Sequence, residues 1–578
     1  MSLFYSGSKV LSNGGAIVLG GGGGSTGSDH AVGDNCSGLA ACSDPSGTYS
    51  LLNSGYALGD NSLIGSGNGI TLVGTTLDSS GTPTGGNIYL RGMGGATATH
   101  MSIANNQTAV GVVTDGGEIN SGTGIILIVG KSENAGATIS HGLELSQTAM
   151  TAITSANTTS SAITIDGDAA AAASSADAQG VQFNFGTSVS ATSLGGGVTI
   201  IGRANSSNYG ITSVSGGGSN SISVQSGGTI TLRTDRLKST WTGTLSGSGG
   251  YLVVEPVTAS TSIGVGGGGG TLTLPASYFS SYFSNGFAGI TIGRADGTGA
   301  IAASALTFQD PLTLLSGGSA ADITLSGAIT DGAGTSAGGL TLKAGRNITT
   351  AASSSITTHG QPVILWSNFT GTGGYINLGT SAPITTNGGA LWLGGGSASA
   401  GTLWNGLTVG NGYAQGYDAG MPMGIFLSSG AISTAGGSIA MHGKSTDVTT
   451  LNNITPDSNP NGAGIVSSFT SQYSINSGIG SIILDGVSVV HSANYYGPGV
   501  YLNGGTMTSA ATSGDAISIT GDSSTTSLNS SYHGEGVVLV AWSSTKSNTI
   551  QATGGGNIII TGTGAPTGDY SSGIRGIM

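Results

Sequence analysis

The feature that most constrains this fold is a short segment that recurs along the whole chain. Each copy starts with glycine or another small residue, continues with alternating apolar residues and ends in glycine. Alternation with a period of two places Ile, Leu and Val on one face of an extended strand and Thr or Ser on the other. The flanking glycines suit turns that need a positive φ. The clearest copies are residues 14–20, 85–92, 162–167, 196–202, 338–345, 436–443 and 555–562.

These segments belong to a longer unit, which is clearest near the C-terminus. One unit contains three candidate strands, at residues 536–540, 548–552 and 557–561. Its first strand recurs at intervals of 40, 35, 37 and 37 residues, and an earlier series recurs at intervals of 31, 38 and 30 residues. The glycines that open these strands are Gly424, Gly464, Gly499, Gly536 and Gly573 in the later series and Gly111, Gly142, Gly180 and Gly210 in the earlier one.

A single unit of this kind cannot bury its own apolar face, whereas stacked units can. The repeat therefore predicts an all-β fold, a single-stranded parallel β-helix or β-solenoid, with about three short strands per coil and long loops. The sequence is compatible with coils of one whole unit and with shorter coils of about 25 residues. Within the last repeat, we expect Ile558 and Ile560 to face the core and Ile559 to face outward.

The composition favours strands over both helices and disorder. Glycine accounts for 110 of 578 residues and charged residues for only 7%, against a usual charged share of about 25%. Few exposed helix formers are left, and glycine costs about 1 kcal/mol relative to alanine inside a helix. Hydrophobic residues make up 37% of the chain and the mean hydropathy is +0.19, so there is apolar surface to bury, unlike in most disordered chains.

The charge balance excludes some classes of partner. The net charge is −13 and the isoelectric point is about 4.6. Nucleic-acid binding requires a basic face, and so does docking on anionic lipid. No apolar run approaches the ~18 residues of a membrane helix. We therefore expect no nucleic-acid partner and no membrane insertion by this segment.

Spacing and composition divide the chain into four expected segments. Residues 1–110 form N-terminal coils with an inserted cysteine loop, and residues 111–240 form further solenoid repeats. Residues 241–410 have shorter coils, and residues 411–578 carry the regular repeats of about 37 residues. The first residues show no secretion signal, and the last ones enter what looks like a new opening strand. We expect the chain to be a fragment of a longer protein.

The two cysteines, Cys36 and Cys42, are close enough in sequence to close a small disulfide loop. Such a bond fits an oxidising compartment; the alternative is two free thiols in a loop. Their spacing matches no zinc motif.

Candidate catalytic or metal-binding groups are sparse. Asp166 and Asp168 alternate at a strand end and could face one side, although a polar turn after residues 163–165 is the favoured reading. Asp29, His30 and Asp34 lie in a glycine-rich loop, but one histidine without further ligand spacing is weak support for a metal site. We predict no catalytic residue, cofactor or metal. The other histidines are expected in loops or on the outward face: His100, His141, His359, His442, His491 and His533.

Tyrosines lie just before several opening strands. Stacked coils would align them on one side of the solenoid as a ladder, which either stiffens a loop edge by packing or contacts a glycan or a protein partner. The residues are Tyr209, Tyr495, Tyr496, Tyr532 and Tyr570.

One stretch of the chain resembles a known family. The segments 287–299, 307–314, 322–329 and 340–349 have the strand and turn phrasing of large repetitive bacterial adhesins, which are exported by two-partner secretion or autotransport and include filamentous haemagglutinin. The resemblance covers residues 260–350 well and the rest by pattern only. It implies a right-handed β-helix, export, an extracellular or bacterial cell-surface location, and a role in adhesion or biofilm formation.

These observations lead to one functional expectation and two alternatives. The chain is expected to be a non-catalytic extracellular scaffold whose loops bind a glycan or protein on a host or bacterial surface. The first alternative is a β-helical polysaccharide-active enzyme or phage-tail depolymerase, which needs two or three carboxylates converging on one groove. The second is a self-assembling extracellular fibre, in which chains associate end to end or laterally.

Overall fold

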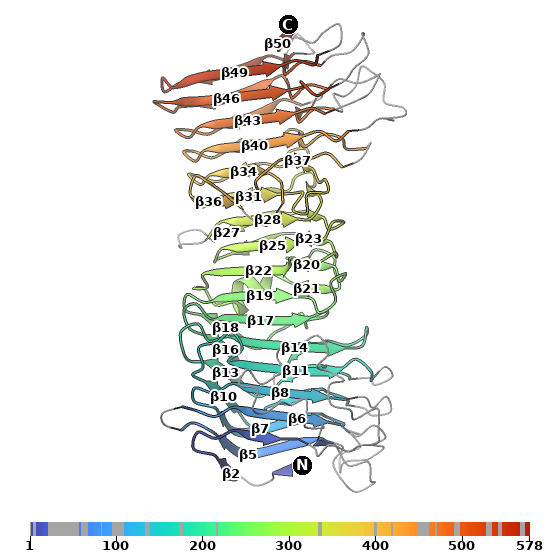
Figure 1. Cartoon of the computed structure of the whole chain (residues 1–578), viewed down its shortest axis with the longest axis vertical. Helices are drawn as coiled ribbons and strands as arrows, with labels where there is room; N and C mark the ends of the chain where they lie inside the picture. Colours follow the sequence, from blue (N-terminus) through green and yellow to red (C-terminus); the bar gives the residue numbers. More distant parts are fainter. Residues whose placement is uncertain are drawn as a thin grey trace. The chain divides into compact units, whose positions relative to one another are not determined.

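Parallel β-strands make up nearly all of the secondary structure in the computed structural model (Figure 1). The chain forms two units: unit 1 comprises Met1–Thr258 and Thr271–Thr291, and unit 2 comprises Ala259–Gly270 and Ile292–Met578. The structure describes residues 2–3, 7–20, 57–58, 68–81, 84–94, 109–132, 139–172, 177–214, 218–332, 338–397, 401–417, 420–447, 462–468, 471–489, 497–526, 534–541, 546–566 and 573–577.

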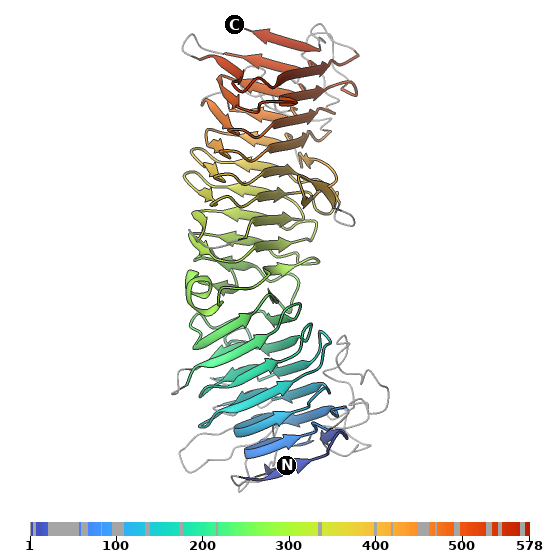
Figure 2. The same cartoon turned by 90° about the vertical axis from the view of Figure 1, so that its left-hand side faces the viewer.

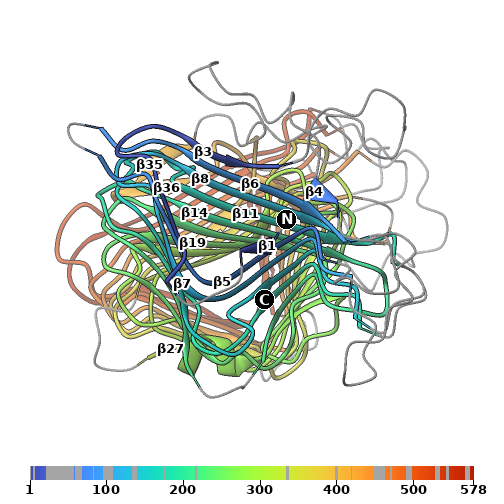
Figure 3. The ribbon, with the colours of Figure 1, turned by 90° about the horizontal axis from the view of Figure 1, so that it is seen from below.

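Unit 1 has two parallel sheets, named A and B here, whose inner faces enclose its core. In Figure 3 the strands of sheet B run in one direction, and β5 and β7 of sheet A lie beside them. Sheet A contains β1 (Ser2–Leu3), β2 (Lys9–Leu11), β5 (Ile70–Asp78), β7 (Val112–Asn120), β9 (Leu143–Leu145), β10 (Thr151–Ser155), β12 (Val181–Phe183), β13 (Ser188–Ala191), β15 (Ile211–Ser213), β16 (Asn220–Val224) and β18 (Gly243–Gly247). Sheet B contains β3 (Ile17–Leu19), β4 (Ala57–Leu58), β6 (Ile88–Met93), β8 (Ile126–Lys131), β11 (Ile163–Ala169), β14 (Val198–Ala204), β17 (Thr229–Thr234) and β19 (Tyr251–Glu255).

Three further elements complete the first part of the chain. β21 (Leu272–Leu274) and a single helical turn, η4 (Tyr278–Tyr282), belong to unit 1. β22 (Gly289–Arg294) contains the sequence boundary between the units. The helical turn is buried through Tyr278, whose hydroxyl donates to the carbonyl oxygen of Lys238 at 2.5 Å.

Unit 2 has three strands per coil, one in each of three parallel sheets named C, D and E. Sheet C contains β20 (Ile263–Val265), β23 (Ile301–Ala303), β26 (Ile323–Leu325), β29 (Ile348–Thr350), β32 (Ile376–Leu378), β38 (Ile425–Leu427), β41 (Ile465–Ser467), β44 (Val500–Asn503), β47 (Val537–Val540) and β50 (Ile574–Ile577). Sheet D contains β24 (Leu306–Phe308), β27 (Ala328–Asp331), β30 (Ser355–Thr357), β33 (Ile384–Thr385), β39 (Ala431–Ser433), β42 (Tyr473–Asn476), β45 (Gly505–Ser509) and β48 (Asn548–Ala552). Sheet E contains β25 (Leu312–Ser316), β28 (Leu340–Ala344), β31 (Val363–Trp366), β34 (Leu391–Gly394), β40 (Ile439–Lys444), β43 (Ile482–Val487), β46 (Asp515–Asp522) and β49 (Asn557–Thr563).

The strands pair in a register that repeats one buried aliphatic residue per coil. In sheet C the paired residues form a single column: Ile301, Ile323, Ile348, Ile376, Ile425, Ile465, Val500 and Val537. Every member of this column is buried. The predicted all-β parallel solenoid is therefore confirmed, and its core is a stack of aliphatic columns.

Coils differ in length at one place only within unit 2, the connection from sheet E to the next strand of sheet C. The opening strands of successive coils begin 22 to 49 residues apart. The shortest connection is residues 345–347, and the longest is residues 395–424, which contains β35 (Thr402–Trp404), β36 (Leu407–Val409) and β37 (Ala414–Gln415). Both coil lengths considered from the sequence therefore occur, because a short coil carries connections of different length.

Several of the recurring glycines lie inside strands rather than in turns. Gly443, Gly486 and Gly521 occupy inner positions of sheet E. A Cβ atom on Gly486 would lie 2.2 Å from the carbonyl oxygen of Gly499, which precedes the next strand of sheet C. The prediction that these glycines serve turns is wrong for this group: they are needed because the main chains of two sheets touch at this corner of the coil.

The turn between sheets D and E does need positive φ values, and it has a fixed hydroxyl. Asn387 and Ala435 adopt φ values of 49° and 50°. The residue before each, Thr386 or Thr434, is fully buried, and its hydroxyl donates to the carbonyl oxygen three residues later. Ser477 repeats the contact at 2.5 Å in the next coil. A buried hydroxyl in this position satisfies a carbonyl that the strand ladders leave unpaired.

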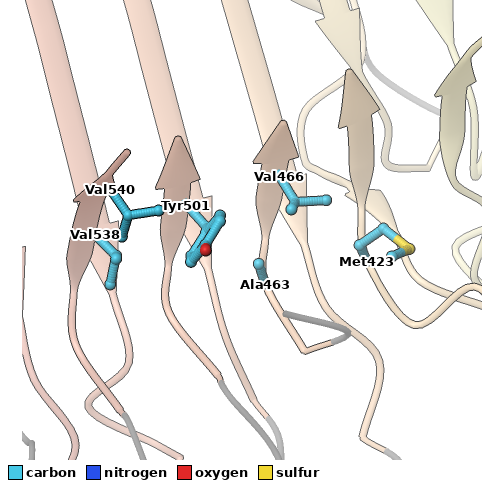
Figure 4. Close-up of a cluster of buried hydrophobic side chains, with 6 residues drawn as sticks. All are labelled: Met423, Ala463, Val466, Tyr501, Val538 and Val540. Atoms are coloured by element: carbon cyan, nitrogen blue, oxygen red, sulfur yellow. The ribbon is translucent and has the colours of Figure 1, made fainter. Parts of the chain in front are cut away.

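Sheet C is apolar on its outer face as well as on its inner face. Val466, Tyr501 and Val538 occupy one outer column, and Figure 4 shows them with Met423 and Val540 in one cluster. All are 4% exposed or less. Strands covered on both faces lose the polar alternation, which explains the continuous apolar runs in these strands.

The core prediction for the last repeat is wrong in part. Ile558 and Ile560 are in register with the buried Ile517 and Ile519, so they continue the inner columns. Yet Ile558 is 42% exposed and Ile559 40% exposed. Among the described strands, β49 pairs with β46 alone, so one side of its row of side chains is not covered by a further strand of sheet E.

Candidate functional site

The most elaborate surface of unit 2 is the outer face of sheet E around the long connection 395–424. Outer positions of this sheet carry Lys343 next to Trp366 and His442 next to Asp485, in matched register. Figures 1 and 2 show the connection beside β31, β34 and β40. We refer to this connection as the insertion.

The insertion begins as an antiparallel hairpin, which is unusual in a parallel protein and follows from its turn sequence. Asn405 and Gly406 have φ values of 49° and 76°, the pattern of a two-residue hairpin turn. Pairing of β35 with β36 places Trp404 opposite Leu407 on one face. The intervening Leu403 lies on the other face and is 76% exposed.

The hairpin covers two tryptophans that project outward from sheet E. Trp366 and Trp392 are 2% and 1% exposed, and they pack with Val409, Trp404 and Leu407 of the hairpin. Their ring centroids are 6.2 Å apart with the rings nearly perpendicular. Aromatic pairs favour this edge-to-face geometry, so the hairpin and the sheet share a small apolar core outside the solenoid.

Hydrogen bonds fasten the rest of the insertion to the coil. The indole N–H of Trp366 donates to the carbonyl oxygen of Gly396 at 2.9 Å. Gly395 and Gly412 exchange two backbone hydrogen bonds, at 3.1 and 2.9 Å, and Gly374 and Gln415 exchange two at 2.8 Å. The insertion is therefore a fixed part of the surface.

Behind the hairpin, the insertion brings a tyrosine to two polar residues of sheet E. The hydroxyl of Tyr413 donates to Oδ2 of Asp485 at 2.9 Å, and Nδ1 of His442 lies 3.3 Å from the same oxygen. Both His442 and Asp485 keep 27% of their side chains exposed. Burial raises the pKa of Tyr413, and the charges of Asp485 and Asp522 raise it further. The tyrosine therefore stays a hydrogen-bond donor.

On the other side of the tryptophans the surface is basic. The Lys343 ammonium lies 4.6 Å from the centroid of a Trp366 ring, and burial lowers the pKa of Lys343. Arg346 donates two hydrogen bonds to Asp322, at 2.8 and 2.6 Å. Its guanidinium also lies 4.9 Å from the ring centroid of Tyr417, which is 40% exposed.

The polar pair predicted in unit 1 does not lie in a turn. Asp166 and Asp168 are in strand β11 and both belong to its outer face. Asp166 is buried and accepts a 2.5 Å hydrogen bond from Arg203 on the neighbouring strand. Burial raises the pKa of Asp166 to about 6, and Arg203 opposes part of that rise. The polar-turn reading is wrong, because β11 continues two residues beyond its apolar pattern.

One histidine expected on an outward or loop position is buried instead. His141 is 1% exposed, with Nε2 3.4 Å from Asp177 and Nδ1 4.0 Å from Glu144. Burial raises the pKa of Glu144, against the charge of His141. His359 is partly exposed, and its ring contacts the buried carboxylate of Asp331.

The remaining predicted residues are distributed as follows. Tyr209 is half-buried, with the Arg236 guanidinium 5.7 Å from its ring centroid. The other members of the predicted tyrosine ladder and of the cysteine loop lie outside the described residues: Tyr495, Tyr496, Tyr532, Tyr570, Cys36, Cys42, Asp29, His30, Asp34, His100, His491 and His533. The ladder and the disulfide remain predictions.

The sequence interpretation missed the group formed by Tyr413, His442 and Asp485. Its signal is the interval between β34 and β38, the longest between successive coils in unit 2, which is also rich in aromatic residues. His442 and Asp485 were separated by 43 residues, so only the register of sheet E brings them together.

No group of three or more His, Cys, Asp or Glu side chains suited to a metal ion occurs in the described ranges. Within those same ranges, no helix has the length and apolar character to cross a membrane. Comparison with known proteins found no matching family model, no matching curated protein and no matching solved structure.

Proposed function

We propose that the chain is a non-catalytic extracellular scaffold of the adhesin kind, which presents binding surfaces along a β-solenoid. The observation that carries this proposal is the restriction of length variation in unit 2 to one edge. Connections from sheet E to sheet C range from residues 345–347 to residues 395–424, while the register of the aliphatic columns is unchanged. Such a frame presents different segments without altering its core.

The lateral surface of the solenoid supports the same proposal. Outer strand positions are mostly small and uncharged, as in β28, where Thr341 alternates with buried Leu340 and Leu342. Stability comes from the stacked columns, at roughly 25 cal/mol per Å² of apolar area removed from water. Chemical variety is therefore left to the connections and to a few outer positions, as expected of an adhesive scaffold.

The test is binding without turnover. Purified protein is applied to immobilised extracellular-matrix proteins, to cultured cells and to a glycan array, and soluble products are analysed in parallel. The proposal expects saturable binding to at least one surface and no change in the bound molecule. Absence of binding to all three surfaces would refute the adhesive role.

A second candidate is a polysaccharide-active enzyme, and one observation favours it. Asp485 and Asp522 lie on the outer face of neighbouring strands, two positions apart in register, beside His442 and Tyr413. Glycoside hydrolases use two carboxyl groups about 5–10 Å apart. Release of reducing ends from a polysaccharide by the wild type, but not by Asp485→Asn, would favour the enzyme over the scaffold.

A further inference from the structure

We propose that Tyr413, His442, Asp485 and Asp522 form a binding site for a neutral sugar unit of a glycan. This inference rests on the proposed adhesive function and assigns it a place and a ligand class. The four residues come from the insertion and from strands β40, β43 and β46.

The site offers hydrogen-bonding groups to solvent in a fixed arrangement. Both contacts to Asp485 use Oδ2, so Oδ1 can accept a sugar hydroxyl. His442 and Asp485 are each about a quarter exposed. Hydrogen bonds with an ionised acceptor are the stronger kind, and carboxylates suit the hydroxyl donors of sugars.

The surroundings hold these groups in place. Three of the four residues are on or at the end of strands whose register is fixed by the sheet, and Tyr413 is secured because its carbonyl oxygen accepts a 3.3 Å hydrogen bond from Asn368. The His442 ring lies 6.1 Å from the Tyr413 ring and 6.2 Å from the Trp392 ring, centroid to centroid. A site on rigid elements loses little ordering entropy on binding.

Charge selects the class of sugar. The site has two carboxylates, and the whole chain carries a net charge of −13. Like charges across an interface disfavour a partner, so uronic-acid and sialylated glycans are repelled. Neutral hydroxyl-rich sugars donate to both carboxylates without this cost.

The experiment uses the full chain and named hexasaccharides. Cellohexaose, chitohexaose, mannohexaose and laminarihexaose are the neutral probes, and hexagalacturonate is the acidic comparison. Binding is followed by calorimetry and by tryptophan emission, because Trp366, Trp392 and Trp404 belong to or adjoin the site. We expect at least one neutral probe to bind and hexagalacturonate not to bind.

Variants locate the binding. Asp485→Asn should weaken binding about tenfold to a hundredfold, and Tyr413→Phe, which removes one hydroxyl, should weaken it as well. Asp515→Asn is the matched control: it removes the same charge from an exposed position at the start of β46 and should bind like the wild type. Circular dichroism melting curves of all three establish that each is folded.

Three results would overturn the inference: no neutral probe binds, hexagalacturonate binds best, or Asp485→Asn and Tyr413→Phe bind like Asp515→Asn. If binding to cells or matrix persists in Asp485→Asn, the site fails while the adhesive function stands. If a bound hexasaccharide is cleaved, the non-catalytic function fails while the site stands.

Discussion

The substitution Gly486→Ala tests the close approach of main chains inside the solenoid. Gly486 lies at an inner position of β43 and is paired on both sides within sheet E. An added Cβ would lie 2.2 Å from the carbonyl oxygen of Gly499, 2.7 Å from Cγ2 of Val500 and 2.8 Å from the carbonyl carbon of Gly499. Two of these atoms are backbone, so a side-chain rotation cannot relieve the contact.

The expected cost follows from how far the neighbours must move. Overpacking a well-filled core costs about 1–3 kcal/mol, and occasionally more. The upper end applies here, because two strands would have to separate while each stays bonded to the coils on both sides. About 3 kcal/mol corresponds to roughly a hundredfold change in an equilibrium constant.

The assay is hydrogen exchange read by mass spectrometry, because repeat proteins open locally. We expect amides of β43 and β44 to exchange about a hundredfold faster in Gly486→Ala than in the wild type. Gly269→Ala is the control, since Gly269 has no heavy atom within 4 Å of an added Cβ. Equal exchange in the two variants would refute the argument that these glycines are there because the chains touch.

Three further predictions concern other parts of the fold. Leu342→Ala should destabilise unit 2 by about 2–5 kcal/mol because Leu342 is fully buried, whereas Thr341→Ala on the outer face should cost under about 0.5 kcal/mol; equal shifts in thermal unfolding would contradict the alternation. Thr434→Val should cost about 1 kcal/mol in chemical unfolding through loss of its hydroxyl contact to Gly437, with exposed Thr506→Val near zero, and matching values for the two would argue against the hydroxyl. Asp166 has a pKa of about 6 in the folded protein against an ordinary 3.8; because burial favours its protonated form, its contribution to stability is present below pH 4 and lost as the pH rises to 6. Asp166→Asn should flatten that loss in melting curves from pH 4 to 7, and an unchanged profile would count against the assignment.

The solenoid was predictable because its signal is local and repeated. Gly464 and Gly499 were expected to open successive strands, and the residues that follow them, Ile465 and Val500, are paired in the structure. One aliphatic residue per coil is sufficient to define a stacked column, whatever the loops do.

The candidate site was not predictable, because it depends on register between coils of unequal length. His442 and Asp485 are 43 residues apart, and Tyr413 and Asp485 are 72 apart. No fixed spacing in the sequence relates them. The covering of outer faces was equally hidden: Tyr501 reads as an outward residue of an alternating strand, yet it is buried in the cluster on sheet C.

The edge from which the sheet E connections leave has a consequence for how such a chain can change. Lengthening a connection from three residues to thirty, as between residues 345–347 and 395–424, costs only about 2 kcal/mol in closure entropy, because that cost grows with the logarithm of length. One additional buried leucine offsets this amount. New sequence can therefore be gained at this edge one coil at a time, and each gain leaves the neighbouring coils free to vary independently.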